Sequence, residues 1–190
     1  MASNDRMPPI AADKMTAEQK KAAEEFTSGR GYAPRGPFGV MLRSPEVMLR
    51  AKAMGDYLRF RNVLPKRVSE MIILMTAREW TQQYEWSHHY GFAVKEGLSK
   101  AILDAIADGR RPETMAADEA AAYDFSSELQ KRRSVSDATY ARALKLFGEQ
   151  GIIDIIGLNG YYTFNAMMMN VARTPVDMDD VPLLKSLPEQ

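Results

Sequence analysis

Apolar residues along most of this chain recur three and four positions apart, the spacing of helices that bury one face. Gln19 follows Thr16 by three residues, which is the pattern of a capping box at a helix start. Ser44, Pro45 and Glu46 supply a cap, a first-turn proline and an acid near the helix dipole. No stretch alternates with period two for long enough to predict a strand. The chain is therefore expected to be all-α, with about eight helices, at about 17–28, 45–61, 65–80, 82–96, 99–109, 116–133, 136–148 and 151–172.

Glycines and prolines interrupt this pattern at residues 29–39, where four glycines and two prolines forbid regular structure. A phosphate-binding loop is not indicated, because such a loop follows a strand and ends in Lys-Ser/Thr or a long glycine fingerprint. We expect instead a loop that packs over a pocket. Farther along the chain, Thr81 is expected to cap the helix 82–96, which Gly97 ends in a left-handed conformation.

The length of 190 residues fits one domain. Residues 1–15 are polar and contain a Pro-Pro pair, so they are expected to form a loose N-terminal tail. The domain itself is expected to cover residues 16–175. Residues 176–190 are acidic, contain prolines and are expected to form a C-terminal tail on the surface.

Composition excludes several classes of function. Lysine plus arginine and aspartate plus glutamate number 25 each, so no net field attracts nucleic acid or an anionic membrane. The absence of cysteine excludes a disulfide framework, a thiolate nucleophile, a CxxC redox pair and a zinc–thiolate site. The apolar run Met71–Met75 is far too short to span a bilayer, and no signal peptide is visible. A cytoplasmic protein without a cofactor is expected.

Both histidines and both tryptophans fall within residues 70–89. On the expected helix 82–96, Gln82, Glu85 and His89 are three and four positions apart, so their side chains share one face. Tyr84 and His88 lie about a quarter-turn away. We predict that Gln82, Tyr84 and His88 contact a small-molecule substrate.

Glu70 lies on the preceding helix, directly before a run of five apolar residues. An acid so close to a buried run needs partners or becomes protonated. If the two helices are antiparallel, Glu70 approaches the face that carries Glu85 and His89. Two carboxyl groups and an imidazole then share a pocket, which is a workable acid–base set. We predict that Glu70, Glu85 and His89 are catalytic.

Other interpretations of these residues remain open. An i, i+4 pair of glutamate and histidine also occurs by chance on exposed helix surfaces. Glu85 and His88 have the Glu-x-x-His spacing of di-iron bundles, but those need two such motifs. A mononuclear metal held by Glu70, Glu85 and His89 is a further alternative. Ser87 and His88 do not make a hydrolase triad, because adjacent helical residues point about 100° apart.

The last predicted helix carries further polar candidates. Asp154 stands between two isoleucine pairs, so it is either a second buried acid or an acid favoured by the dipole at its helix start. Asn159, Tyr161, Tyr162 and Asn165 are candidates to line the pocket from this second half of the chain.

Glu70, Gln82, Tyr84, Glu85 and His89 carry a resemblance to a known family. The peroxidase branch of the alkylhydroperoxidase D-like superfamily has Glu, eleven residues, Cys, one residue, His-Cys, three residues and His. The same spacing here gives Glu70, Gln82, Tyr84-Glu85 and His89, so both cysteines are replaced. The chain resembles the carboxymuconolactone decarboxylase family of this superfamily.

This resemblance is clearest over residues 36–110, and it implies an all-α subunit that forms homo-oligomers, as dimers, trimers or hexamers. It also implies a pocket at Glu70, Glu85 and His89. The cysteine mechanism of the peroxidases is excluded, because the chain has no thiol. Acid–base chemistry on a small carboxylated lactone or a related acid is expected, with His89 moving the proton and the two glutamates orienting it. A metal- or ligand-binding oligomer without turnover, or a scaffold, is the alternative.

Overall fold

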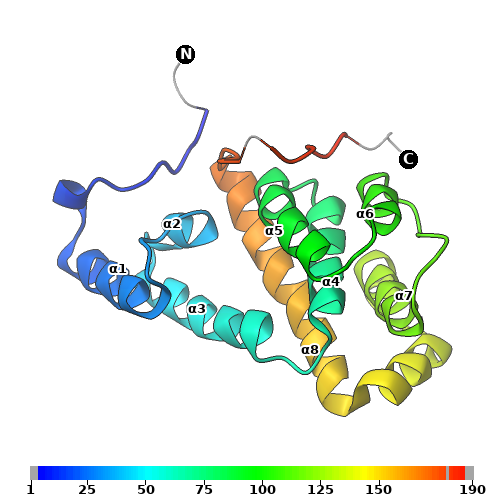
Figure 1. The fold of residues 1–190 in the computed structure, drawn as a ribbon. Helices are drawn as coiled ribbons and strands as arrows, with labels where there is room; N and C mark the ends of the chain where they lie inside the picture. Colours follow the sequence, from blue (N-terminus) through cyan, green and yellow to red (C-terminus); the bar gives the residue numbers. More distant parts are fainter. Residues whose placement is uncertain (1–3, 179, 187–190) are drawn as a thin grey trace.

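The computed structural model describes residues 4–178 and 180–186, and parts of both expected tails, residues 1–3, 179 and 187–190, lie outside this range. All regular secondary structure in the described chain is helical, and these residues contain no strand (Figure 1). A short 3-10 turn at Ala12–Lys14 precedes eight α-helices in the described residues. These are α1 Ala17–Arg30, α2 Pro37–Met41, α3 Pro45–Phe60, α4 Lys66–Glu79, α5 Gln83–Lys95, α6 Lys100–Ala107, α7 Ala117–Arg132 and α8 Asp137–Ala172.

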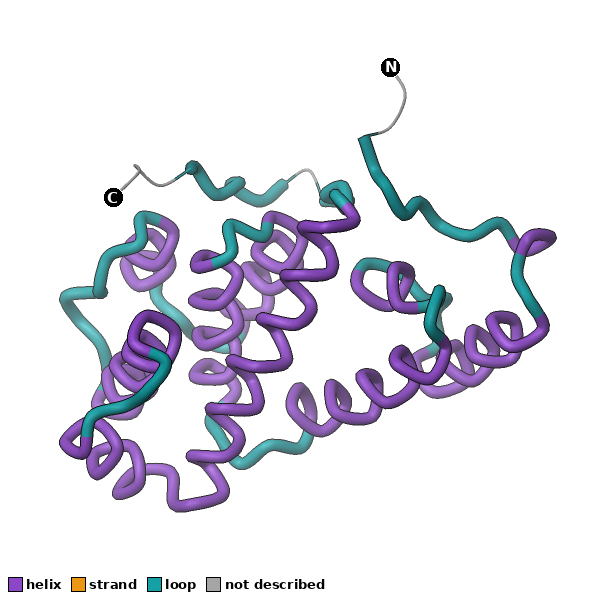
Figure 2. The backbone as a smooth tube through the Cα atoms, turned by 180° about the vertical axis from the view of Figure 1, so that it is seen from behind, coloured by secondary structure: helices purple, strands orange, loops and turns teal. Residues whose placement is uncertain are grey.

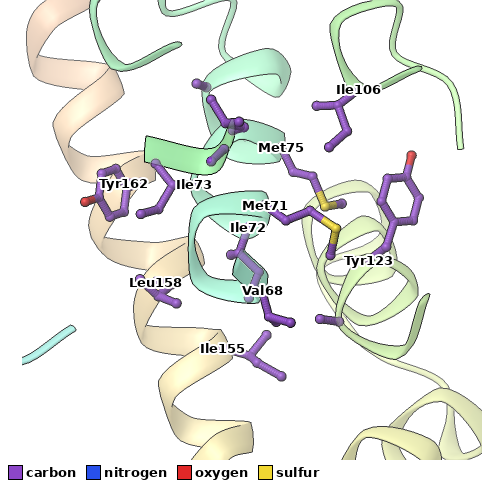
Figure 3. Packing of buried hydrophobic residues seen from close by; sticks show 14 of the residues in the cluster. Val68, Met71, Ile72, Ile73, Met75, Ile106, Tyr123, Ile155, Leu158 and Tyr162 are labelled. Atoms are coloured by element: carbon purple, nitrogen blue, oxygen red, sulfur yellow. The ribbon is translucent and has the colours of Figure 1, made fainter. Parts of the chain in front are cut away.

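Helix α4 is the centre of the core. It packs against α5, α7 and α8, and also against α6. Val68, Met71 and Ile72 are fully buried, as the nearly continuous apolar pattern of this segment predicts. Figure 3 shows these side chains between Leu158 of α8 on one side and Tyr123 of α7 on the other. Burial on every side fixes the position of α4, and therefore of any polar residue that it carries.

Helices α1, α2 and α3 form an arm on the other side of α8 from α4 and α7 (Figures 1 and 2). This arm has its own small cluster of buried residues, which includes Phe26, Phe38 and Met48. Contacts from α2 and α3 to α8 join the arm to the rest of the molecule. The arm and the α4–α5 pair therefore approach each other beside α8.

The predicted helices 136–148 and 151–172 are two parts of one bent helix, α8. Ser136 caps its start, and Gly148 has a left-handed φ of 67° with an extended ψ of 179°. The helix bends there and resumes at once, as the turn in the yellow part of Figure 1 shows. Gly148 thus ends the first helical segment, as expected, and the second segment follows it across the kink.

The loop expected at residues 29–39 is shorter than predicted. Helix α1 runs to Arg30 and ends on Gly31, whose φ is 75°, rather than on Gly29. The loop then gives way to α2 at Pro37, because this proline suits a first helical turn despite the glycines around it. Gly36 has a φ of 55°, and a Cβ there would lie 2.5 Å from the ring of Tyr84. Glycine is therefore required where the loop crosses α5.

Two expected caps differ in the structure. The Ser44 side chain makes no capping hydrogen bond to α3. Thr81 does not cap α5, because the tight α4–α5 turn gives it a φ of 45° and its hydroxyl accepts from Arg78 at 2.7 Å. Gln82 caps α5 instead, since its Oε1 accepts from the Glu85 N–H at 3.0 Å. The capping box of Thr16 and Gln19 is present as predicted.

The described C-terminal residues are attached to α5. The Trp86 indole donates to the Pro182 carbonyl at 2.9 Å, and the Gln83 amide exchanges two hydrogen bonds with the Leu184 backbone. Leu184 is only 6% exposed, which departs from the expected surface tail. None of the helices in the described part of the chain has the length and hydropathy needed to cross a membrane.

Asp154 on α8 holds the turn between α3 and α4. It is 2% exposed, and its two carboxyl oxygens accept from the Tyr57 hydroxyl and the Val63 backbone N–H, each at 3.0 Å. Of the two interpretations of this residue, the buried acid is confirmed. Its role is structural, because both oxygens are occupied by groups of the arm.

Replacing Asp154 with alanine is expected to destabilise the protein by about 2–3 kcal/mol, because a buried N–H and a hydroxyl lose their acceptor. Urea unfolding followed by circular dichroism measures the change. Glu149→Ala is the control, since this exposed acid lies on the same helix, and we expect a change within about 0.5 kcal/mol. Equal stability losses in the two variants would contradict the structural role of Asp154.

Candidate active site

The turn between α4 and α5 places three polar side chains next to one another. Glu70 lies on α4, while Glu85 and His89 lie one turn apart on α5, which packs against α4 after a three-residue connection. Gln82 fixes the start of α5 through its cap to Glu85. Antiparallel packing of the two helices therefore brings Glu70 to His89, as the sequence predicts.

His89 stands between the two carboxyl groups. Its Nδ1 lies 2.6 Å from Glu70 Oε2, and its Nε2 lies 3.5 Å from Glu85 Oε2. Because a carboxylate only accepts hydrogen bonds, Nδ1–H donates to Glu70 and Nε2 is left for Glu85. Glu85 and His89 are each 4% exposed. The structure brings all three residues together, and their catalytic role stays a prediction.

Glu85 is a strongly desolvated acid. Burial raises the pKa of its carboxyl group, and the charges of His89 and Arg59 only partly oppose this increase. Its Oε1 is buried and has no hydrogen-bond partner among the described residues. Asn165 Oδ1 is another buried oxygen that lacks a partner in the described chain, and both residues line the same cavity. These unpaired groups are available to a bound molecule.

A cavity of about 430 Å³ opens above Glu85 and His89, between the α1–α3 arm and the α5–α8 side of the molecule. The loop 31–36 contributes Tyr32 and Arg35 to its wall, so the expected loop over a pocket is confirmed. Its volume lies within the range of sites for small molecules. The lining residues are Gly29, Arg30, Tyr32, Arg35, Pro37, Phe38, Arg59, Phe60, Tyr84, Glu85, His88, His89, Phe92, Tyr161, Tyr162 and Asn165.

Three tyrosines in the cavity wall have neutral hydroxyl groups. Burial raises the pKa of Tyr161 and Tyr162, and burial together with Asp177 raises that of Tyr84. A neutral phenol donates a hydrogen bond, so these groups can stabilise negative charge on a ligand. The Tyr162 ring also meets His89 edge-on, with centroids 5.1 Å apart, and limits the movement of the imidazole.

Two of the three predicted substrate-contacting residues line this cavity. The Tyr84 and His88 rings stack with centroids 4.7 Å apart and an interplanar angle of 13°. Burial lowers the pKa of His88, although its Nδ1 lies 3.6 Å from an Asp177 oxygen. His88 is therefore a neutral imidazole at neutral pH, with Nδ1 free of hydrogen bonds to described residues.

Gln82 has a different role from the one predicted. It is absent from the cavity wall, and its amide is used at both ends: Oε1 caps α5, and Nε2 donates to Asn170 at 3.3 Å. Its spacing from Glu85 placed it on the right face of the helix. As the cap, however, it lies before the first turn, so its side chain folds back onto the backbone.

Of the polar candidates on the last predicted helix, some line the cavity and one does not. Tyr161, Tyr162 and Asn165 line the cavity, as expected. Asn159 does not, because it hydrogen-bonds Ser126 and Gln130 in a separate buried polar network between α7 and α8. All of these residues lie on α8, and their position around the helix decides which of them face the site.

Sequence reasoning missed the arginines. Arg30, Arg35 and Arg59 come from the arm, and all three line the cavity. Arg30 forms an ion pair with Asp56 at 2.5 Å and lies against the rings of Phe26 and Phe38. The glycine-rich loop was the available signal, because it carries Arg35 and directly follows Arg30. Helical spacing alone does not predict that these arginines lie near the site residues of α5.

A larger cavity of about 520 Å³ lies elsewhere, where α4, α6 and α7 end. It contains no histidine, and the buried Arg78 in its wall donates to the carbonyls of Ala107 and Lys185. Burial lowers the pKa of Arg78. An arginine at this place satisfies backbone carbonyls near helix ends, which is a structural role. The smaller cavity is therefore the candidate active site.

The donor set of the candidate site does not match a metal centre. Among residues 4–178 and 180–186, no group of three or more histidine, aspartate or glutamate side chains is arranged to hold a metal ion. Glu70 and Glu85 lie on opposite sides of the His89 imidazole, one near Nδ1 and the other near Nε2, rather than around a common point. The metal-binding alternative therefore has no suitable ligands at this site.

Comparisons with known proteins concern the fold. No protein-family model and no curated protein matches the chain. A peroxidase-related protein with an alkylhydroperoxidase AhpD core, from Ralstonia eutropha JMP134, has a TM-score of 0.74 at 16% identity, over 93% of this chain and 94% of that one. A putative antioxidant defence protein AhpD from Agrobacterium tumefaciens has a TM-score of 0.63 at 13% identity, over 76% of this chain and 100% of that one.

The debrominase Bmp8 is a third structural neighbour. A complex of its cysteine-to-alanine variant with 2,3,4-tribromopyrrole has a TM-score of 0.68 at 12% identity, over 92% of both chains. Three similar solved structures thus share the order and arrangement of helices that surround the Glu70–His89–Glu85 site. The chain has the alkylhydroperoxidase D-like fold, which the spacing from Glu70 to His89 had indicated.

Proposed function

We propose that this protein is an enzyme that transfers a proton to or from a small organic molecule in the cavity above Glu85. The observation that supports this proposal most directly is the row formed by Glu70, His89 and Glu85, in which Glu85 is desolvated and its Oε1 has no hydrogen-bond partner among the described residues. A carboxyl group whose pKa is raised above its ordinary value is better suited to donate a proton as a general acid.

Each member of the row has a distinct role in this proposal. Glu70 is absent from the cavity wall and orients His89 through Nδ1. His89 and Glu85 both line the cavity, so a proton passes between them and the substrate through Nε2 or the Glu85 carboxyl group. Glu85 was expected only to orient His89, and in this proposal it also transfers a proton. The Tyr161 and Tyr162 hydroxyls lie on the same wall and can stabilise developing negative charge.

The narrower form of the proposal is a reaction of the decarboxylase or lyase type on a carboxylated lactone or a related acid. A decarboxylation leaves a carbanion or enolate, which must be stabilised and then protonated. The site supplies an acid for the second step and hydroxyl donors for the first. The fold neighbours include a debrominase and a peroxidase-related protein, so they support no particular reaction. A thiol peroxidase mechanism is excluded by the absence of cysteine.

Two further expectations also remain proposals: the cytoplasmic location and assembly into homo-oligomers. Support for assembly comes from α8, where Ile153, Ile156, Met167 and Val171 are exposed large apolar residues. Their offsets of three, eleven and four place them along one side of the helix. Exposed apolar surface of this kind is often covered in an oligomer.

Light scattering coupled to size-exclusion chromatography is expected to give a mass of two or more chains. Ile156→Glu is expected to shift the distribution towards the monomer, because it would place a charge within a buried interface. Lys145→Glu, at an exposed and already polar position of α8, is the control. A monomeric wild-type protein would contradict this expectation.

His89→Ala is expected to lower turnover at least about tenfold without unfolding the protein, because the proton path is interrupted. The assay is loss of substrate, followed by mass spectrometry, over a panel of unsaturated carboxy-lactones and β-keto acids. Tyr90→Phe is the control, since this neighbour lies outside the cavity wall and should retain turnover. A folded His89→Ala variant with normal turnover would refute the proposal.

Glu85→Gln is expected to stabilise the protein at alkaline pH. Folding raises the pKa of Glu85 above its ordinary value of 4.5, so the folded state holds this proton more tightly than the unfolded state. The resulting stabilisation is complete below that value and is lost as the pH rises through the folded pKa. Glutamine cannot lose a proton, so the stability of the variant relative to wild type should increase as the pH rises above 4.5 and through the raised pKa of Glu85.

Urea unfolding of both proteins across this range measures the difference in the free energy of unfolding. Glu79→Gln serves as the control, because Glu79 is an exposed residue at the end of α4. A difference between wild type and Glu85→Gln that stays constant with pH would show that Glu85 is not held in its protonated form.

A further inference from the structure

Arg59 is a half-buried cation in the wall of the candidate site without an ionic partner. It lies in the last turn of α3, and its guanidinium is 5.3 Å from the ring centres of both Phe60 and Phe92. Across residues 4–178 and 180–186, its guanidinium forms neither an ion pair nor a hydrogen bond. Arg30, in the same wall, is neutralised by Asp56. Arg59 therefore keeps its hydrogen-bonding capacity for something else.

The carboxyl groups of the site do not balance this charge. Glu70 is engaged by His89 at 2.6 Å, and Glu85 is desolvated, which favours its neutral form. Arg35 adds a second guanidinium without an ion pair in the described chain, 5.0 Å from the Tyr32 ring centre. The cavity thus carries an excess of positive charge. A partly desolvated guanidinium is stabilised most effectively by a bidentate anion such as a carboxylate.

The walls next to Arg59 are aromatic. Phe60 and Phe92 are 56% and 44% exposed, so their rings remain open to contact although they are large and apolar. Phe38 lies deeper in the same cavity, and Tyr162 lies beside His89. Ring faces pack well against flat, conjugated molecules. The cavity therefore combines three features. Arg59 offers a site for an anion, the aromatic rings offer flat apolar walls, and His89 and Glu85 are the proposed proton-transfer groups.

We propose that the cavity binds a planar carboxylate, of the aromatic or conjugated class, and that Arg59 recognises its carboxylate group. The ring or conjugated chain of the ligand packs among Phe60, Phe92 and Phe38. This inference rests on the proposed function only in assigning the ligand as a substrate, since binding itself needs no turnover.

Benzoate is the probe, and isothermal titration calorimetry on the full-length protein is the measurement. Benzoate is expected to bind with a dissociation constant in the millimolar range or tighter, which is ordinary for so small a ligand (on the order of 4 kcal/mol). Benzamide has the same shape without the charge and should bind at least about tenfold more weakly. Cyclohexanecarboxylate keeps the charge without the flat ring, and it too should bind more weakly than benzoate.

Three variants assign the carboxylate site. Arg59→Gln is expected to weaken benzoate binding about tenfold while leaving benzamide unchanged, and Arg59→Lys should restore part of the loss. Arg61→Gln is the matched control. Arg61 lies two residues farther on, is exposed, has its guanidinium 5.8 Å from the Tyr57 ring centre and is absent from the cavity wall. Circular dichroism confirms that each variant is folded.

Several results would overturn the inference. These are equal binding of benzoate and benzamide, equal losses in the two glutamine variants, or no benzoate binding to the wild-type protein. If Arg59→Gln lowers stability but not benzoate affinity, Arg59 is a structural residue held by its two phenylalanines. The proposed function is tested separately, since His89→Ala should abolish turnover and still bind benzoate. Benzoate binding without any turnover would thus support the carboxylate site and contradict the proposed enzymatic function.

Discussion

The site depends on the cost of burying ionisable groups beside the apolar helix α4. Glu85 and His89 are almost completely removed from water, and a charge in such a place is unstable unless another group compensates it. Glu70 accepts a hydrogen bond from His89 Nδ1 at 2.6 Å and so satisfies this side of the imidazole. Glu85 has no equivalent partner, so burial pushes it towards the neutral acid. One row of three side chains therefore holds a paired imidazole and an unpaired acid, and the fixed position of α4 keeps that difference in place.

Much of this arrangement could be predicted because it is local. Glu70, Glu85 and His89 lie within twenty residues, and the three- and four-residue spacing of a helix determines which of them share a face. The continuous apolar pattern of 71–75 likewise predicts that α4 is buried, and the structure confirms it. Local rules failed where the backbone is unusual. Thr81 has the composition of a cap, but a tight turn gave that task to Gln82. At Gly148, by contrast, the prediction of a helix end is confirmed, because its left-handed φ separates the two helical segments of α8.

The remainder of the site could not be predicted because it is assembled over long distances in the chain. Arg59 and Arg30 reach Glu85 only through the packing of the arm against α8, which no pattern within α1 or α3 encodes. Tyr161 and Asn165 were recognised as candidates, but whether their side chains face the cavity depends on how α8 is rotated relative to α5. The polar residues that define the type of chemistry were therefore visible in the sequence. The arm residues that line the other side of the cavity, which we propose recognise the ligand, required the structure.

Position 85 shows how one scaffold can serve different chemistry. In the motif that the chain resembles, a cysteine occupies this place, next to the same glutamate and histidine. A thiol is useful there when it gives up its proton, because the thiolate is the nucleophile. A carboxyl group in the same dry environment behaves in the opposite way, since desolvation makes it keep its proton. The carboxylate is also a far weaker nucleophile than a thiolate, while the carboxylic acid is a good hydrogen-bond and proton donor. In the proposed function, Glu85 therefore replaces a nucleophile with a group that exchanges a proton with the ligand.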